Sequence, residues 1–341
     1  MNPFSPDVEE KNLDTEDLVG RVVDDLVVME LIGAGASGTV YKAVEKGPES
    51  RMVALKVMKR VEQTLRQKHG ETGNPFERDL KVSKVVVQPS VARVHRIGRT
   101  MEGLYFAVME LVDGEPLEAE LQYRQRLPWK EALALMIDIA RAVTAFHSLN
   151  IIHRDVSPAN VLVKTHRDGR RRVKLIDFGI AMFGHESDSE GTSLFETAVG
   201  TPQYMAPEQA LGHGSTRRTD VFSLGAIFYH MLGGTSVLSL KRANAHACME
   251  YLKAGKPIPS IPLPSLVRDD VPPGLVRLIE RSISIDPQRR PADANAFVEE
   301  CLRFKSDSVA TPQTRREKLS SLVGGLFRKK QVSQSRFTRR D

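Results

Sequence analysis

Two short motifs in the middle of the chain constrain its fold and chemistry more than any other feature. Residues 153–160 read H-R-D-V-S-P-A-N and residues 177–179 read D-F-G. The carboxylate of Asp155 is suited to hold an attacking hydroxyl group, and Asn160 and Asp177 carry the oxygen ligands that Mg²⁺ prefers. Either motif alone is a weak signal. Both together, in this order and this close, predict a site for phosphoryl transfer.

A glycine-rich turn lies upstream of these motifs. Residues 33–40 read G-A-G-A-S-G-T-V and separate two runs of strand-forming residues, 26–32 and 39–44. Glycines let backbone N–H groups approach phosphate oxygens because no Cβ stands in the way. A dinucleotide-binding fingerprint would need a helix after this turn, whereas a strand is predicted here. A third strand ends in V-A-L-K, and its lysine, Lys56, is the candidate for contacting nucleotide phosphates.

These motifs together resemble the catalytic core of the eukaryotic-like serine/threonine protein kinases of bacteria. The segment that follows Asp177 ends in G-T-P-Q-Y-M-A-P-E at residues 200–208, which is similar to the signature of Ser/Thr rather than Tyr kinases. The resemblance covers about residues 26–304. It implies an α+β fold with two lobes, a β-rich N-lobe at about 21–112 and a mainly α-helical C-lobe at about 113–304.

The resemblance also implies a role for individual residues around Mg²⁺ and ATP. Asp155 would accept the hydrogen bond of a substrate hydroxyl, Asn160 and Asp177 would coordinate Mg²⁺, and Lys56 would hold the phosphates. Met109 would back the adenine, whose edge would form hydrogen bonds with backbone groups of Glu110 and Val112. The nucleotide-binding residues implied in this way, besides Lys56, are Ile32, Gly33, Gly35, Gly38, Val40, Ala54, Met109, Glu110, Val112 and Leu162.

Two positions depart from the family pattern. A helix predicted over 76–87 should carry the glutamate that pairs with Lys56, but counting back from Pro89 puts Asp79 there. Asp79 is the favoured partner, and a register shift that uses Glu77 or Glu71 stays open. The second departure is Ser157, where many Ser/Thr kinases have a lysine that touches the γ-phosphate. Similar S-P-x-N loops occur in bacterial kinases, so this change does not predict an inactive protein.

Regulatory and structural roles are implied for further residues. Arg154 can pair with a phosphate on the segment from 177 to 208, whose candidate phosphorylation sites are Thr192, Ser193 and Thr197. Thr201 would sit beside Asp155. Structural roles are implied for three more side chains. Asp220 would bind the backbone of the catalytic loop, residues 153–160, and Arg290 would pair with Glu208. The basic run at 170–172 is interpreted as a solvated loop.

Charge is distributed unevenly along the chain. Residues 1–25 contain eight acidic and two basic residues, whereas residues 305–341 contain ten basic and three acidic ones. Residues 1–20 are predicted to be a disordered acidic head and 305–341 a basic, disordered tail. Apolar residues at 319, 322, 323, 326 and 327 leave open an amphipathic helix that docks on a membrane or a partner. Aromatic interleaving is absent, so nucleic-acid binding is not expected.

The remaining composition predicts a cytoplasmic protein. The two cysteines form no disulfide or metal pattern, and neither a signal peptide nor a membrane-spanning run is recognisable. The function predicted is transfer of the γ-phosphate of Mg–ATP to Ser/Thr hydroxyls of proteins, with autophosphorylation of the 177–208 segment. Two alternatives remain: a nucleotide-binding pseudokinase that acts as a scaffold or switch, and an anchoring module whose main function lies in the tail.

Overall fold

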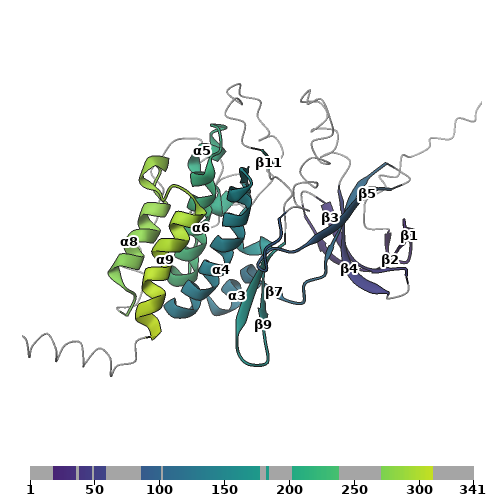
Figure 1. The fold of residues 1–341 in the computed structure, drawn as a ribbon, viewed down its shortest axis with the longest axis horizontal. Coiled ribbons are helices and arrows are strands. Elements are labelled where there is room, and N and C mark those ends of the chain that lie inside the picture. The colour runs from purple at the N-terminus through teal and green to yellow at the C-terminus, as the bar shows by residue number, and fades with distance from the viewer. Residues whose placement is uncertain are drawn as a thin grey trace, which may run out of the picture.

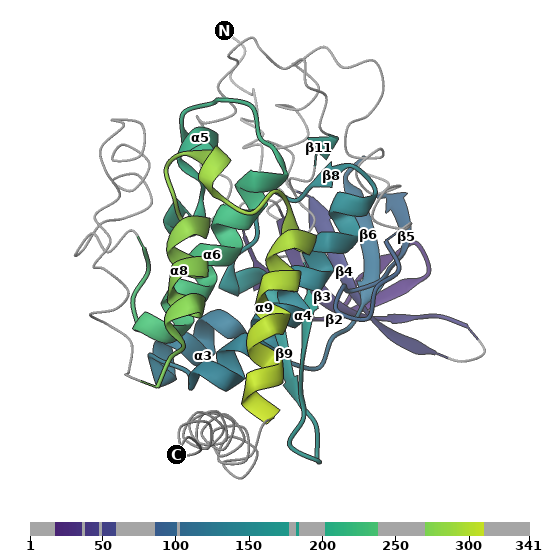
Figure 2. The same ribbon diagram turned by 60° about the vertical axis from the view of Figure 1, so that its left-hand side comes forward.

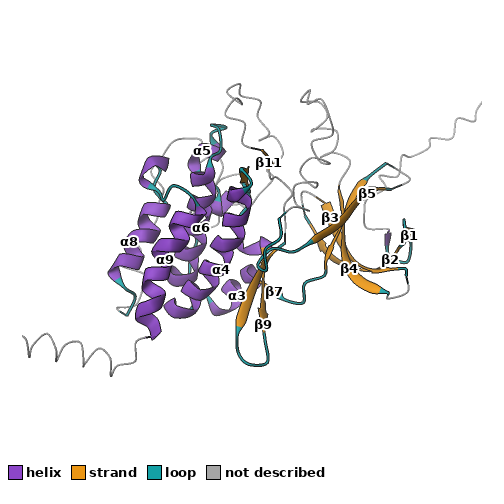
Figure 3. Cartoon of the chain, in the orientation of Figure 1, coloured by secondary structure: helices purple, strands orange, loops and turns teal. Residues whose placement is uncertain are grey.

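The chain folds into a β-rich lobe followed by a mainly helical lobe, as the α+β prediction requires (Figure 1, Figure 3). The structure is a computed structural model that describes residues 18–35, 38–47, 50–58, 86–100, 103–176, 182–183, 202–237 and 270–309. The two-lobed α+β fold predicted from the sequence is therefore confirmed.

The N-lobe contains a six-stranded antiparallel sheet with the order β1-β2-β3-β4-β6-β5. The strands are β1 (Val22–Val23), β2 (Leu26–Ala34), β3 (Gly38–Glu45), β4 (Arg51–Met58), β5 (Val94–Arg99) and β6 (Tyr105–Glu110). Side chains alternate between the two faces of a strand. On β4, for example, Val53, Leu55 and Val57 enter one buried cluster, and Ala54 and Met58 contribute to the other.

The face of this sheet that carries Lys56 is built from cross-strand pairs. Val40 on β3 lies opposite Lys56 on β4, and Lys56 lies opposite Ala107 on β6. Ala54 is likewise paired with Met109. Directly opposed residues share a face of an antiparallel sheet. The register thus gathers these side chains, which the sequence spreads over 70 positions, on one surface.

Helices make up most of the C-lobe (Figure 2). They are α3 (Leu117–Arg124), α4 (Trp129–Ser148), α5 (Pro207–Ala210), α6 (Arg217–Gly233), α8 (Pro273–Ser282) and α9 (Ala294–Val309). The ends of α6 follow from local sequence. Thr216 and Thr219 form a reciprocal capping box at its start, and Gly234 at φ 76° provides the left-handed C-cap.

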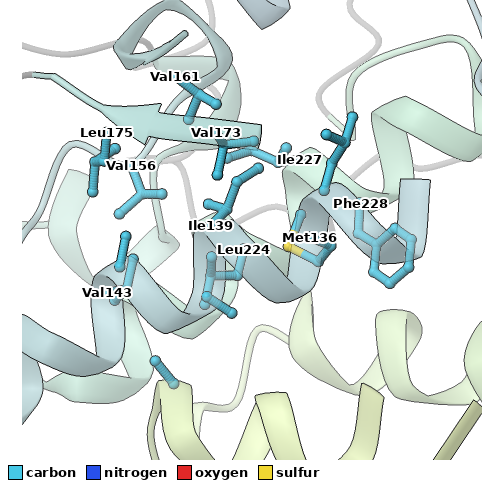
Figure 4. Packing of buried hydrophobic residues seen from close by; sticks show 14 of the residues in the cluster. Met136, Ile139, Val143, Val156, Val161, Val173, Leu175, Leu224, Ile227 and Phe228 are labelled. Atoms are coloured by element: carbon cyan, nitrogen blue, oxygen red, sulfur yellow. The ribbon is translucent and has the colours of Figure 1, made fainter. Parts of the chain in front are cut away.

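Short strands and turns connect the helices to the site. They are β7 (Glu115–Pro116), β8 (Ile151–Ile152), β9 (Val161–Thr165), β10 (Arg171–Leu175) and β11 (Met182–Phe183), with 3₁₀ turns at Pro158–Asn160, Pro202–Tyr204 and Pro287–Arg289. Strands β10, β9 and β7 form one sheet in that order. Val156, next to Asp155, packs into the same apolar core as Val143 of α4 and Leu224 of α6 (Figure 4). The catalytic loop is thus anchored on the helical core.

Two local predictions were wrong. The helix predicted over 76–87 does not reach its expected end, because Val86 and Val87 are not helical; most of that segment lies outside the described residues. The basic run at 170–172 is not simply a solvated loop. Arg171 belongs to β10, is only 17% exposed, and forms ion pairs with Glu120 of α3 and Glu131 of α4. In the described part of the chain, no helix combines the length and apolarity needed to cross a membrane.

Candidate active site

Asn160 holds Asp155 in place through two hydrogen bonds. The Nδ2 group of Asn160 donates to the backbone carbonyl oxygen of Asp155 and to its carboxylate Oδ2, each at 2.9 Å. Asn160 can reach both acceptors because a 3₁₀ turn over Pro158–Asn160 folds the chain back, with Asn160 N donating to Ser157 O. One face of the amide therefore orients the carboxylate, and its side-chain oxygen is a hard ligand of the kind that Mg²⁺ prefers.

Asp220 fixes the backbone that precedes Asp155. Its carboxylate is completely buried near the start of α6 and accepts hydrogen bonds from His153 N and Arg154 N, both at 2.8 Å. Hydrogen bonds donated to a buried carboxylate favour its ionised form. Burial by itself would raise the pKa of Asp220, but the hydrogen bond from His147, the nearby imidazoles and the His153 amide outweigh it and lower that pKa.

His147 completes this arrangement, and its tautomer follows from its contacts. Its Nδ1 accepts from Ala294 N at 3.2 Å, and a backbone amide can only donate. The proton must therefore be on Nε2, which lies 2.9 Å from Asp220 Oδ2. The imidazole thus connects the start of α9 to the carboxylate that holds the catalytic loop. His147 was not predicted from the sequence, although it lies on the apolar face of α4, where a polar side chain needs a partner.

The glycine-rich turn contains glycines that differ in whether their surroundings leave room for a side chain. A Cβ at Gly38 would lie 2.4 Å from the carbonyl oxygen of Val57, so the close approach of β3 and β4 requires glycine there. A Cβ at Gly33 would meet no atom of the described residues within 4 Å, and neither Gly33 nor Gly38 adopts a positive φ. Packing within the described part of the chain thus does not require glycine at position 33. The close approach of a nucleotide phosphate to this backbone stays a prediction.

The residues predicted to surround the adenine lie on β2, β3, β4 and β9 and at or just after the end of β6. Met109 and Ala54 are buried and face each other across β6 and β4. The amide of Glu110 already donates to Arg93 O at 2.8 Å, so this N–H group is engaged within the protein. Glu110 also uses its side chain, which lies 2.8 Å from Lys174 Nζ and ties β6 to β10. The other predicted residues here, Ile32, Val40, Val112 and Leu162, are partly or fully exposed.

Glu208 and Arg290 form a buried two-point ion pair. The guanidinium nitrogens lie 2.7 and 2.9 Å from the two carboxylate oxygens, and Thr219 Oγ1 donates to the same carboxylate. Arg290 also donates to the carbonyl oxygens of Ser284, Ile285 and Arg218. Every N–H group of the guanidinium thus donates a hydrogen bond, and together these bonds hold α5 against α6 and the turn before α9.

Tyr204, near the end of the 177–208 segment, contacts His230 of α6, and this contact was not predicted from the sequence. The Tyr204 hydroxyl lies 2.7 Å from His230 Nδ1, and the rings are stacked. Ser223 Oγ donates to Tyr204 O at 2.8 Å. Burial lowers the pKa of His230 to about 4, so the imidazole is neutral and accepts from the tyrosine. Burial and the charge of Glu118 raise the pKa of Tyr204.

Comparison with known proteins decides the family. The model of the protein kinase domain matches residues 26–304. The chain belongs to the protein kinase family. A serine/threonine-protein kinase of Myxococcus xanthus, pkn3, is 31% identical over 83% of this chain and 51% of its own length. PknA of Mycobacterium tuberculosis is 33% identical over 80% of this chain and 59% of its own length. The chain thus spans half to three fifths of these bacterial-type Ser/Thr kinases.

Several predicted kinase residues lie outside the described residues: Asp177, Asp79, Thr192, Ser193, Thr197 and Thr201. Their roles stay predictions, as do those of the acidic head and the basic tail. Helix α9 continues to Val309, so the start of the tail predicted from residue 305 is helical rather than disordered. Ser157, the departure from the family pattern, is described and is only 1% exposed. Its hydroxyl has no hydrogen-bond partner among the described residues and does not cap the turn that follows it. The site of this kinase domain therefore contains a buried hydroxyl that its own loop does not use.

Proposed function

We propose that this kinase domain transfers the γ-phosphate of Mg–ATP to serine and threonine hydroxyls of proteins. The observation that carries the proposal is the pair of hydrogen bonds from Asn160 to Asp155, because they hold a carboxylate in one orientation beside an amide oxygen. In this mechanism Asp155 accepts a hydrogen bond from the attacking hydroxyl and orients it. The relatives' printed names, serine/threonine-protein kinases, support the choice of acceptor.

The phosphates of ATP would lie between the glycine-rich turn and Lys56. Lys56 is 8% exposed on the sheet face shared with Val40, a position from which an ammonium group can reach a phosphate held by the turn. Asn160 and Asp177 would hold Mg²⁺, which neutralises charge on the phosphates when bound. Oxygen donors of this kind fit that ion. Since little covalent chemistry falls to the protein, positioning and cationic groups supply most of the rate.

The test is phosphate transfer from Mg–ATP to the protein itself and to a basic protein substrate, with the sites mapped by mass spectrometry. Asp155→Asn and Lys56→Met should abolish transfer. Lys42→Met is the matched control, because Lys42 lies on the neighbouring strand and pairs with Glu30 at 2.8 Å. Transfer that survives in Asp155→Asn, or that Lys42→Met abolishes equally, would contradict the proposal.

We also propose that the kinase phosphorylates its own 177–208 segment at Thr192, Ser193 or Thr197 and acts in the cytoplasm. An active preparation with no phosphate in the 177–208 peptide would contradict the proposed autophosphorylation. The pseudokinase is the second candidate, and the feature that favours it is Ser157, at a position where many Ser/Thr kinases have a lysine that touches the γ-phosphate. Retained binding of Mg–ATP without any transfer would establish it.

A further inference from the structure

Arg154, directly before the catalytic aspartate, has an unusual backbone conformation. Its φ is 64°, in the left-handed region that a residue with a Cβ occupies at a cost of about 1–2 kcal/mol. Such a conformation persists only where the surroundings hold it in place. The contacts of the Arg154 backbone therefore decide where the next residue, Asp155, points.

Both backbone polar groups of Arg154 are held by side chains from other elements. Asp220 Oδ1 accepts the hydrogen bond of Arg154 N at 2.8 Å. On the other side, Gln209 Nε2 donates to Arg154 O at 2.9 Å. The carbonyl oxygen belongs to the peptide that joins Arg154 to Asp155. Its direction thus fixes the plane of that peptide and the start of the Asp155 side chain.

The contact that Gln209 makes with Arg154 leaves part of the Gln209 amide unsatisfied. Its amide oxygen, Oε1, is buried and has no hydrogen-bond partner among the described residues. The carbonyl of Arg154 can only accept, so the amide cannot be flipped to satisfy Oε1 without losing the bond to Arg154. A buried polar atom left unsatisfied is unusual in a native structure and calls for an explanation. The explanation that fits here is orientation of the catalytic loop.

We propose that Gln209 is a positioning residue for phosphoryl transfer, which holds the Arg154–Asp155 peptide so that the Asp155 carboxylate faces the substrate hydroxyl. This inference rests on the proposed kinase function and names a residue for it. Gln209 lies on α5, directly after Glu208, whose carboxylate Arg290 anchors. The ion pair between Glu208 and Arg290 thus fixes α5, and the hydrogen bond from Gln209 to Arg154 O ties the catalytic loop to α5.

The first variant is Gln209→Met, which keeps the length of the side chain and removes the donor. Without the bond to its carbonyl, Arg154 can relax from the left-handed region and Asp155 turns away. We expect kcat to fall about 10- to 100-fold, whereas the KM for ATP stays within about twofold. The melting temperature should change little, because the substitution removes one unsatisfied atom, Oε1, and creates another, Arg154 O. Hydrogen exchange of the peptide over residues 151–157 should become faster.

The second variant is Gln209→Glu, which gives a pH readout that a merely structural role would not move. The introduced carboxyl group faces the carbonyl of Arg154, so its ionised form repels that oxygen and its protonated form can donate to it. Burial beside a carbonyl raises the pKa of such a group. The activity of this variant relative to wild type should therefore rise as the pH is lowered. A constant ratio would count against the proposal.

The matched control is Ser282→Ala, which also removes a buried side-chain donor to a backbone carbonyl. Ser282 Oγ donates to Leu278 O at 2.8 Å within α8, away from the catalytic loop. It should lower the melting temperature and leave kcat unchanged. If Gln209→Met transfers phosphate as fast as an active wild type, the positioning role is wrong. If the wild type itself transfers none, the proposed function has failed instead.

Discussion

Arg290 and Glu208, 82 positions apart in the sequence, meet in a two-point ion pair at 2.7 and 2.9 Å, with the guanidinium fully buried. A buried charge is tolerable only while its partner and hydrogen bonds remain. This ion pair therefore holds the end of the 177–208 segment against the helical core, and it fixes the position of the residues that follow Glu208.

Arg290→Met should destabilise the C-lobe by about 3–5 kcal/mol, because it removes the cation that pairs with the buried Glu208 carboxylate and the hydrogen bonds donated to three carbonyl oxygens. Urea unfolding measures the loss. Arg281→Met is the control: Arg281 forms an ion pair with Glu300 but is 45% exposed, so its loss should cost less than about 1 kcal/mol. Equal losses in the two variants would show that burial does not govern the pair. Adding Glu208→Gln to Arg290→Met should cost less than the sum of the two single changes.

The motifs in the sequence predicted the family, the lobes and the positions of Asp155 and Asn160, because phosphoryl transfer needs fixed residue types at fixed spacing. The contacts that hold those residues were harder to predict. His147 is a polar residue on the apolar face of a helix, and nothing in the local sequence marks its partner, Asp220, which lies 73 residues away. Gln209 donates to a backbone carbonyl, which leaves no charge or motif signal. Arg171 looked like part of a solvated run because sequence alone does not reveal Glu120 and Glu131 beside it.

The two kinds of glycine in the 33–38 turn should respond differently to alanine. Gly38→Ala forces a Cβ against Val57 O, so β3 and β4 must separate and the melting temperature should fall. In Gly33→Ala the new Cβ meets no atom of the described residues, so stability should be unchanged while the affinity for ATP falls. Thermal melts and calorimetric titration with Mg–ATP measure the two effects. Unchanged ATP affinity in Gly33→Ala would remove the phosphate cradle from this turn.

Ser157→Ala should stabilise the protein by about 1 kcal/mol. A buried hydroxyl without a partner carries its full desolvation cost, and alanine removes the hydroxyl without leaving a large cavity. Denaturant unfolding of the variant, beside Ser282→Ala as a hydroxyl that does have a partner, provides the measurement. The two variants should shift the midpoint in opposite directions. A loss of stability in Ser157→Ala would mean that its hydroxyl has a partner outside the described residues.

Stability should depend on pH through His230. Burial lowers its pKa in the folded protein to about 4, whereas an unfolded histidine titrates near 6.5. Between these values the unfolded chain binds a proton that the folded chain does not, so the free energy of unfolding falls as the pH falls, by up to about 1.4 kcal/mol per pH unit. Above about pH 6.5 both states are neutral and this contribution is constant. Below about pH 4 both are charged and the loss stops growing.

His230→Gln isolates this effect, because the amide oxygen can still accept from the Tyr204 hydroxyl but the side chain does not titrate. The pKa of His95 is also lowered, by partial burial and by Arg51 and Arg93, but that contribution is common to both proteins. Urea unfolding at a series of pH values between 7 and 4 should therefore show a smaller loss of stability in His230→Gln than in wild type. Parallel curves would mean that His230 is solvated in the folded protein and that its contact with Tyr204 is not maintained in solution.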